Sequence, residues 1–164
     1  MIAGDAFACI KITGRANFTY GPAFKCLLTC LNKKGCKRII IDLSECILMD
    51  STFLGVLAGF GLAVNPTKTA DKCDIELLNP STRIHELLEN LGVLSLFKIT
   101  TGTLQLPDGL KATSPETGNP TQEELTRTCL EAHKILMNAN PENVARFKEV
   151  TEYLAEDLKN LEKH

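Results

Sequence analysis

The feature that most constrains this chain is a regular alternation of short apolar strand patterns with helical patterns over its first hundred residues. The strand patterns are rich in β-branched residues, and the helical patterns repeat apolar residues at steps of three and four. The expected strands are residues 6–13, 37–44, 73–78 and 96–100, and the expected helices are residues 21–34, 52–64 and 82–90. This order favours an α/β fold with a mainly parallel, mixed sheet and helices packed on it.

Several connections carry their own signals. Gly35 follows a run of lysines at the position of a C-terminal glycine cap, which predicts the end of the first helix there. Residues 45–49 are expected to form a loop before the second helix, and residues 65–68 a turn, because proline and asparagine resist continuation of a helix.

Composition changes after Leu104. Residues 104–119 are poor in large apolar side chains and rich in Pro, Gly, Ser and Thr, which is typical of a linker. Beyond the linker, residues 120–164 predict a helical hairpin, whose first helix opens with a capping box at Thr121 and Glu124. Since an isolated hairpin of this size is marginal in water, it must dock on the domain of residues 1–103, on a second copy or on a partner.

Charge and hydropathy exclude several classes of protein. A net charge of -2 provides no broad basic field, so we expect no nucleic-acid partner. The longest apolar run, residues 53–64, falls short of the roughly 20 residues that cross a bilayer. Residues 1–5 do not resemble a secretory signal, so a soluble, cytoplasmic protein without membrane insertion is expected.

The seven cysteines are odd in number and lack C-x-x-C spacing, so they are interpreted as small core residues of a reducing compartment. A metal site at Cys26, Cys30 and Cys36 is the alternative, but no metal or other cofactor is expected. The three histidines are expected at solvated helix positions. They are His85, His133 and His164.

The segment from Asp50 to Thr52 places an acid and two hydroxyls at the start of an apolar helix. The first amides of a helix lack intrahelical partners and carry partial positive charge, so this position attracts anions. The simpler interpretation is that Asp50 or Ser51 caps the helix, which contributes roughly 1 kcal/mol. Three glycines follow, at 55, 59 and 61, and allow close approach either to the sheet or to another protein.

The sequence DLSECILMDSTFLGVLAGF resembles the central segment of STAS domains, the fold of bacterial anti-sigma factor antagonists. The resemblance continues upstream in CIKITGRANFTYGPAFKCLL and downstream in ELLNPSTRIHELLENLGVLSLFKI. It covers roughly residues 1–103 and leaves the C-terminal hairpin outside. A STAS-like fold is therefore expected for the first part of the chain.

What the resemblance implies is a regulatory protein that is not an enzyme and that switches partners. Ser51 would be the phosphoacceptor of a cognate serine kinase that is also an anti-sigma factor, and a phosphatase would reverse the modification. The unmodified form would bind the kinase and release the sigma factor, which requires the Ser51 hydroxyl to be uncovered. The expected partner-binding residues are Asn17, Asp50, Thr52, Phe53 and Gly55.

The chain departs from the family pattern at two positions. Phe53 replaces the usual glycine, where a ring would either obstruct a kinase or anchor the interface, and Asn17 replaces an aspartate near the phosphoacceptor. Thr52 is a minor alternative phosphoacceptor. The alternative function is a STAS scaffold subunit of a lipid-transport or sensory complex that is never phosphorylated, and the C-terminal helices are a candidate surface for a homodimer.

Overall fold

The computed structural model describes residues 2–4, 7–64, 73–106, 108, 111–112 and 118–164. Six strands of this described part form one sheet in the order β5-β4-β3-β2-β1-β6. The strands are β1 (Ile2–Gly4), β2 (Phe7–Ala16), β3 (Arg38–Met49), β4 (Asp74–Leu78), β5 (Lys98–Thr100) and β6 (Lys111–Ala112). Strands β2 to β5 are parallel, whereas β1 runs antiparallel to β2 and to β6. The predicted α/β fold with a mainly parallel, mixed sheet is confirmed.

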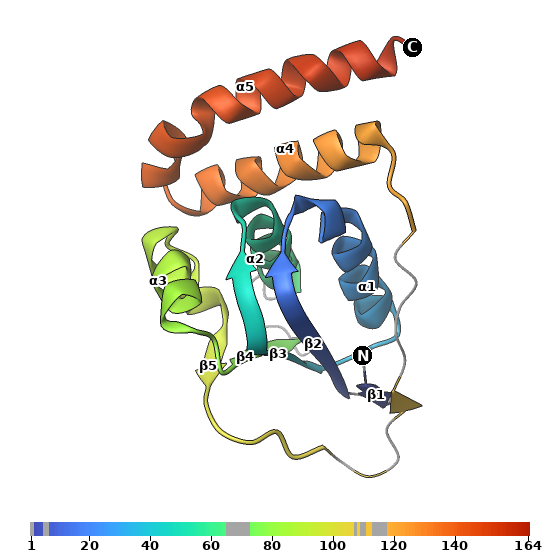
Figure 1. Ribbon diagram of the computed structural model, residues 1–164, viewed down its shortest axis with the longest axis vertical. Helices are drawn as coiled ribbons and strands as arrows, with labels where there is room; N and C mark the ends of the chain where they lie inside the picture. Colours follow the sequence, from blue (N-terminus) through green and yellow to red (C-terminus); the bar gives the residue numbers. More distant parts are fainter. Residues whose placement is uncertain (1, 5–6, 65–72, 107, 109–110, 113–117) are drawn as a thin grey trace.

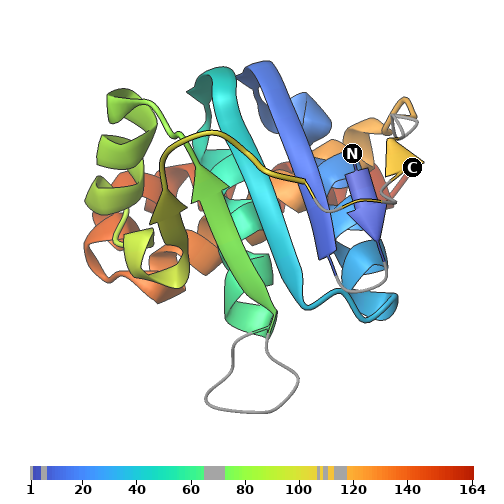
Figure 2. The same ribbon diagram turned by 90° about the horizontal axis from the view of Figure 1, so that it is seen from below.

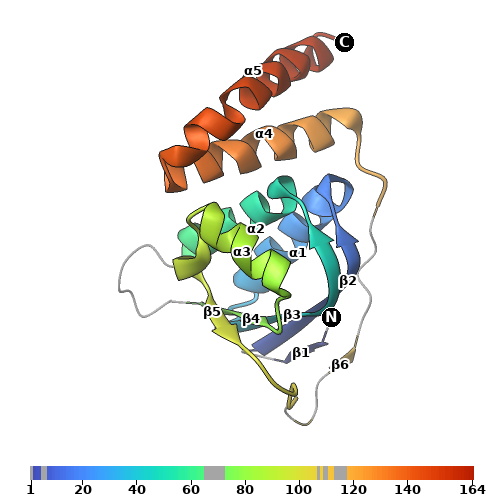
Figure 3. The same ribbon diagram turned by 60° about the vertical axis from the view of Figure 1, so that its left-hand side comes forward.

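The helices form successive layers on one side of this sheet (Figures 1 and 3). Helices α1, α2 and α3 cover the sheet, α4 crosses α2 beyond the carboxyl ends of β2 and β3, and α5 rests on α4. The helices are α1 (Gly21–Lys33), α2 (Ser51–Val64), α3 (Thr82–Asn90), α4 (Gln122–Ala139) and α5 (Glu142–Glu162), with 3-10 turns η1 (Phe18–Tyr20) and η2 (Leu94–Leu96).

The core lies between the sheet and its first helical layer. Ile39, Ile41 and Leu77 project from the central strands and are fully buried, as are Leu54 and Leu57 of α2. The opposite face carries a smaller apolar cluster, where Leu104 packs on Cys9, Ile40 and Leu78. In Figure 2 the segment that contains Leu104 crosses this face of the sheet.

Local signals place the helix ends. Gly35 adopts a φ of +78°, as a glycine cap requires. Ser81 caps α3 by accepting a hydrogen bond from the amide of Ile84 at 3.2 Å. At α4, the Thr121 hydroxyl accepts from the amide of Glu124, and the Glu124 carboxylate accepts from the amide of Thr121. The predicted capping box is confirmed.

The prediction of a loop at residues 45–49 is wrong. β3 continues to Met49 and pairs with the second half of β2, from Thr13↔Glu45 to Ala16↔Met49, with register irregularities after Lys11 and after Gly14. These irregularities break the strict alternation of buried and exposed residues, and so hide the strand from the sequence pattern. The short strands β1 and β6 were not predicted, and the predicted turn at 65–68 lies outside the described residues.

The hairpin of α4 and α5 docks on the rest of the chain, the first of the three alternatives. Leu136 and Ala132 of α4 are buried against the core. A second attachment lies at the end of α3, where the buried amide nitrogen of Asn143 donates to the carbonyls of Leu91 (2.9 Å) and Leu136 (2.8 Å). Within the described ranges, no helix has the length and apolarity needed to span a membrane.

The seven cysteines differ in burial, and Cys129 on α4 is intermediate. Four are buried, which agrees with their interpretation as core residues: Cys9, Cys36, Cys46 and Cys73. Cys26 and Cys30 are exposed on α1, so the core interpretation is wrong for these two, because they lie on the face of α1 that neither α2 nor the sheet covers. Cys36 lies beyond the end of α1 with its thiol bonded to the carbonyl of Arg38.

Candidate functional site

Asp50 joins the end of β3 to the start of α2 and binds two backbone amides. Its Oδ1 accepts a hydrogen bond from the amide of Phe53 at 2.8 Å, which caps α2. Its Oδ2 accepts from the amide of Phe18 at 2.6 Å, which ties η1 to the same point. The acid therefore fixes the backbone on both sides of the helix N-terminus.

Asn17 also caps a helical segment, the 3-10 turn η1. Its Oδ1 accepts from the amide of Thr19 at 3.1 Å and from the Thr19 hydroxyl, so its side chain caps η1. Asn17 and Asp50 thus lie at the same edge of the sheet, where β2 and β3 both end.

Ser51 is the first residue of α2, and its hydroxyl pairs with a histidine from the C-terminal hairpin. The Oγ of Ser51 lies 3.0 Å from the Nε2 of His133. The other ring nitrogen, Nδ1, lies 2.7 Å from the carbonyl oxygen of Cys129. Because a carbonyl only accepts, Nδ1 carries the hydrogen, and in the neutral ring Nε2 accepts the hydrogen of the Ser51 hydroxyl.

This arrangement corrects two expectations. His133 was expected to be solvated, yet only 6% of it is exposed, and its ring packs edge-on against Phe147 with the ring centroids 4.9 Å apart. The Ser51 hydroxyl was expected to be uncovered, yet Ser51 is half-buried below α4. The cause is that α4 docks on the N-terminal end of α2.

Thr52, the second hydroxyl of the segment, is also covered by α4. It is 4% exposed, and its hydroxyl lies 3.6 Å from the sulfur of Cys129, to which it donates. Burial raises the pKa of the Cys129 thiol and the negative charge of Asp50 raises it further, while the Thr52 hydroxyl acts in the opposite direction. Cys129 is therefore held as a neutral thiol, which is a weak nucleophile.

The glycines of α2 allow this close contact. A Cβ on Gly55 would lie 2.6 Å from the carbonyl oxygen of Ala132, and one on Gly59 would lie 2.6 Å from the Cδ1 of Ile135. Gly61 instead faces Phe97 and Leu96. Two of the three glycines therefore serve the contact of α2 with the chain's own α4.

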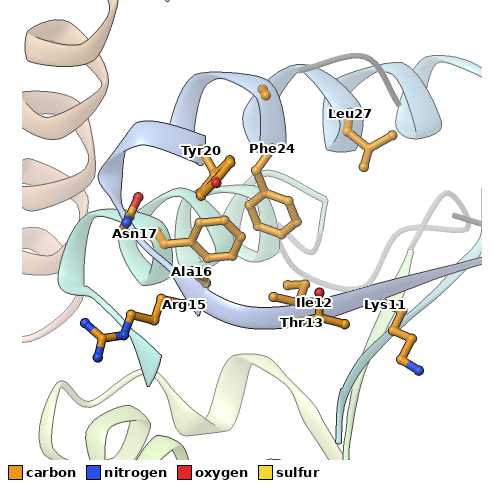
Figure 4. Close-up of a pocket in the computed structure, with 11 residues that line it drawn as sticks. Lys11, Ile12, Thr13, Arg15, Ala16, Asn17, Tyr20, Phe24 and Leu27 are labelled. Atoms are coloured by element: carbon orange, nitrogen blue, oxygen red, sulfur yellow. The ribbon is translucent and has the colours of Figure 1, made fainter. Parts of the chain in front are cut away.

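Phe53 points into the interior. It is 4% exposed, and its ring stacks on that of Phe24 with centroids 4.2 Å apart and an interplanar angle of 14°. The edge of this stack lines a pocket of about 540 Å³ between β2 and α1. Figure 4 shows Phe24 and Leu27 pointing across this pocket toward Ile12 and Thr13, with the charged ends of Lys11 and Arg15 directed away from it.

Exposed apolar residues surround the same edge of the sheet. Phe18 is 45% exposed, Tyr20 is 48% exposed, and Ile47 is 67% exposed. Phe18 and Tyr20 belong to η1, and Ile47 lies near the end of β3. They are exposed at the edge of the sheet where β3 leads into Asp50 and Ser51, and Tyr20 also lines the pocket.

Three residues of the site, all on α4, were not predicted from the sequence: Cys129, Ala132 and His133. A signal for them was present. His133 lies on the same helix face as Thr126, Cys129 and Leu136, at steps of three and four, and a histidine on the buried face of a helix requires a hydrogen-bond partner.

Comparisons with known proteins identify relatives of this chain. A family model described as the STAS domain matches residues 4–104. Anti-sigma-B factor antagonists of Staphylococcus aureus strains NCTC 8325 / PS 47 and COL are each 31% identical to the chain over 99 residues, which is 60% of this chain and 88% of those proteins. A solved structure, the anti-sigma factor antagonist SpoIIAA in its unphosphorylated form, is similar with a TM-score of 0.47 and 16% identity over 62% of this chain and 84% of that chain.

The family model spans more than half of the chain and includes β2 to β5, α1 to α3 and the segment from Asp50 to Gly55. The resemblance of DLSECILMDSTFLGVLAGF to the central STAS segment is thereby confirmed. Helices α4 and α5 lie outside the matched residues. The chain belongs to the STAS domain family.

Proposed function

We propose that this protein is a phosphorylation-switched regulator of the anti-sigma factor antagonist class. With Ser51 unmodified, it binds a cognate anti-sigma factor that is also a serine kinase, and it acts by binding in the cytoplasm, without catalysis of its own. The observation that carries this proposal is the position of Ser51, directly after Asp50 at the first turn of α2, in a STAS chain related to proteins named anti-sigma-B factor antagonists.

The electrostatics of this position suit a reversible phosphate. A phosphoserine brings about -1.5 to -2 charges, which the partial positive charge of a helix N-terminus stabilises, so the fold persists. The carboxylate of Asp50, held beside it by the amides of Phe18 and Phe53, adds negative charge to the same edge. A partner docked there loses affinity through repulsion and desolvation. A change from a mostly bound to a mostly unbound partner requires the binding free energies of the two forms to differ by several kcal/mol.

The surface for the partner extends from Ser51 over the exposed residues Phe18, Tyr20 and Ile47. Among the predicted partner-binding residues, Asn17 and Asp50 support this surface by holding η1 in place. Phe53 lines the pocket and stacks on Phe24, while Thr52 and Gly55 are in contact with α4. The direct partner contacts of these five residues remain predictions, as does a homodimer through the C-terminal helices.

A STAS scaffold that is never phosphorylated is the second candidate. It is favoured by the bond between Ser51 and His133, because a hydroxyl already paired inside the protein is not free to react. In that case the protein is a subunit of a lipid-transport or sensory complex, and affinity purification recovers the other subunits of that complex without a kinase.

The test is phosphorylation by the cognate kinase with ATP, followed by localisation of the phosphate by mass spectrometry in the wild type and in Ser51→Ala. Modification of the wild type but not of Ser51→Ala supports the proposal. Ser44→Ala is the matched control, since Ser44 is an exposed serine that bonds to Asp42. Undiminished labelling of Ser51→Ala would exclude Ser51 as the phosphoacceptor.

A further inference from the structure

Helix α4 occupies the part of the proposed partner surface that contains Ser51, and it leaves Phe18, Tyr20 and Ile47 exposed. It covers Thr52 with Cys129, Gly55 with Ala132, and Ser51 with His133. The contact is tight, because the carbonyl oxygen of Ala132 lies only 2.6 Å from the position that a Cβ on Gly55 would take. A kinase cannot approach the first turn of α2 from this side while α4 is in place.

The pairing of Ser51 with His133 also excludes the modification itself. The two atoms are 3.0 Å apart, which is a hydrogen-bond distance and leaves no space for a phosphoryl group between them. The ring cannot simply turn aside, since its Nδ1 is bonded to Cys129 and its edge packs on Phe147. Phosphorylation of Ser51 in this side-chain rotamer therefore requires α4 to move.

The hairpin is attached to the rest of the chain by the buried residues Ala132 and Leu136 and by a small number of polar contacts. Beyond its contacts with α1 and α2, it is held by Asn143 and by Arg146, whose Nη1 donates to the carbonyl of Asn90 at 3.2 Å. Arg127 ties the two helices to each other through ion pairs with Glu123 and Glu162. The two helices are thus tied to each other, and their opening separates Ala132 and Leu136 from the core, a local event whose free energy is at most that of global unfolding.

We propose that the hairpin of α4 and α5 is an intramolecular competitor for the partner surface, with the bond between Ser51 and His133 as its latch. This inference rests on the proposed function and adds its regulation. The closed form neither binds the kinase nor accepts phosphate, so the apparent affinity for the partner equals the affinity of the open form multiplied by the fraction of open molecules.

In the open form the kinase transfers the γ-phosphoryl group of ATP to the Ser51 hydroxyl. The Oγ of Ser51 forms a bond to the γ-phosphorus of ATP as the bond from that phosphorus to the bridging oxygen of ADP breaks, and the serine proton passes to the kinase. The phosphate then stands where the ring of His133 lay, so the hairpin cannot close again until a phosphatase removes it. Closing therefore depends on the state of Ser51.

A reversible lock tests this competition. Thr52→Cys places a thiol beside the native Cys129, because the Thr52 hydroxyl lies 3.6 Å from that sulfur. Diamide takes up the two thiol hydrogens, and the resulting disulfide joins α2 to α4. Cys26→Ser and Cys30→Ser remove the exposed thiols from this background. The matched control adds Cys129→Ser, which leaves no partner for the lock.

We expect the oxidised, locked protein to be phosphorylated and bound by the kinase at least tenfold less than the same protein after reduction, and the control to be insensitive to oxidation. Equal rates in the locked and reduced forms would overturn the competition while leaving the proposed function intact. If neither the wild type nor any reduced form is phosphorylated, the proposed function fails. Whether the hairpin opens separately is then tested by a measurement that needs no kinase.

That measurement is the rate at which a maleimide on a large polyethylene glycol labels the thiol of Ser51→Cys, with Cys26, Cys30 and Cys129 replaced by serine. Asn143→Ala removes a hairpin attachment that involves neither Ser51 nor His133, so we expect it to raise this rate at least tenfold. Cys73, which directly precedes β4, is 1% exposed. Its thiol should stay unlabelled as long as the fold is intact. An unchanged rate, or simultaneous labelling of Cys73, contradicts a separately opening hairpin.

Discussion

Gly55 of α2 and Ala132 of α4 are in backbone contact: a Cβ added to Gly55 would lie 2.6 Å from the carbonyl oxygen and 2.7 Å from the Cβ of Ala132. Backbone atoms cannot yield as a side chain can, so a methyl group here separates the two helices. The contact explains why a helix that packs on the sheet carries a glycine on its other face.

Gly55→Ala is therefore expected to destabilise the protein by about 1 to 3 kcal/mol, even though alanine is the better helix former. Gly59→Ala is the control, because its Cβ would come too close only to the Cδ1 of Ile135, at 2.6 Å, which is the far end of a flexible side chain. Urea unfolding measures both. Equal stability of the two variants would show that α4 does not hold this position in solution.

Phe53→Ala is expected to cost about 3 kcal/mol or more, since it removes a buried ring from its stack on Phe24. Phe18→Ala, at a side chain that is 45% exposed, should change the unfolding free energy by less than about 1 kcal/mol. Thermal or urea unfolding distinguishes the two. A small effect at Phe53 would place its ring outside the core.

Asp50→Ala is expected to cost about 2 kcal/mol, because it removes the cap of α2 and the bond to the amide of Phe18. Asp50→Asn keeps one oxygen acceptor and should recover part of the loss. Hydrogen exchange at the amides of Phe18 and Phe53 locates the effect. Unchanged protection of both amides in Asp50→Ala would refute this assignment.

Asn143→Ala is expected to cost about 2 kcal/mol, since it leaves the buried carbonyl of Leu91 without its donor and removes one donor from Leu136. Arg146→Ala breaks only an exposed bond to Asn90 and should cost less than about 1 kcal/mol. Hydrogen exchange should rise at the start of α5 and the end of α3 in the first variant. Similar exchange in both variants would argue against Asn143 as an anchor.

Stability should fall at alkaline pH. Burial raises the pKa of the Cys73 thiol to about 11, and it also raises the pKa values of Cys9, Cys36 and Cys46. Above pH 9 the unfolded chain releases these protons more readily than the folded one, so the stabilisation present below pH 9 is lost as the pH rises toward 11.

From its pKa shift, Cys73 alone accounts for about 2 to 3 kcal/mol of this loss. Urea unfolding at several pH values between 8 and 11 measures the slope, and Cys73→Ala should be less stable at pH 8 but flatter in its pH dependence. A slope unaffected by Cys73→Ala would assign the alkaline loss to other groups.

The parts of the fold that depend on local chemistry were predictable from the sequence. Thr121 and Glu124 form their capping box, and Gly35 takes the left-handed conformation, because both signals act within one turn of chain. The extension of β3 to Met49 was missed, since its pairing depends on the irregular register that β2 imposes.

Of the candidate site, only the residues at the start of α2 were predictable from the sequence. The segment from Asp50 to Thr52 is legible because it lies at one helix start, and the family resemblance adds to it. The rest of the site comes from His133 and Cys129, which are 82 and 77 residues away from their partners Ser51 and Thr52. No pattern within one sequence states that two helices so far apart meet, so the cover over Ser51 emerged only in three dimensions.

Helix α5 meets the remainder of the chain chiefly at its first turn, through Asn143 and Arg146, and otherwise rests along α4. At its far end the ion pair between Glu162 and Arg127, 2.9 Å long, ties α5 back to the beginning of α4. The two helices are therefore connected at both ends, and a ligand that engages the outer helix also engages a helix that contacts Ser51.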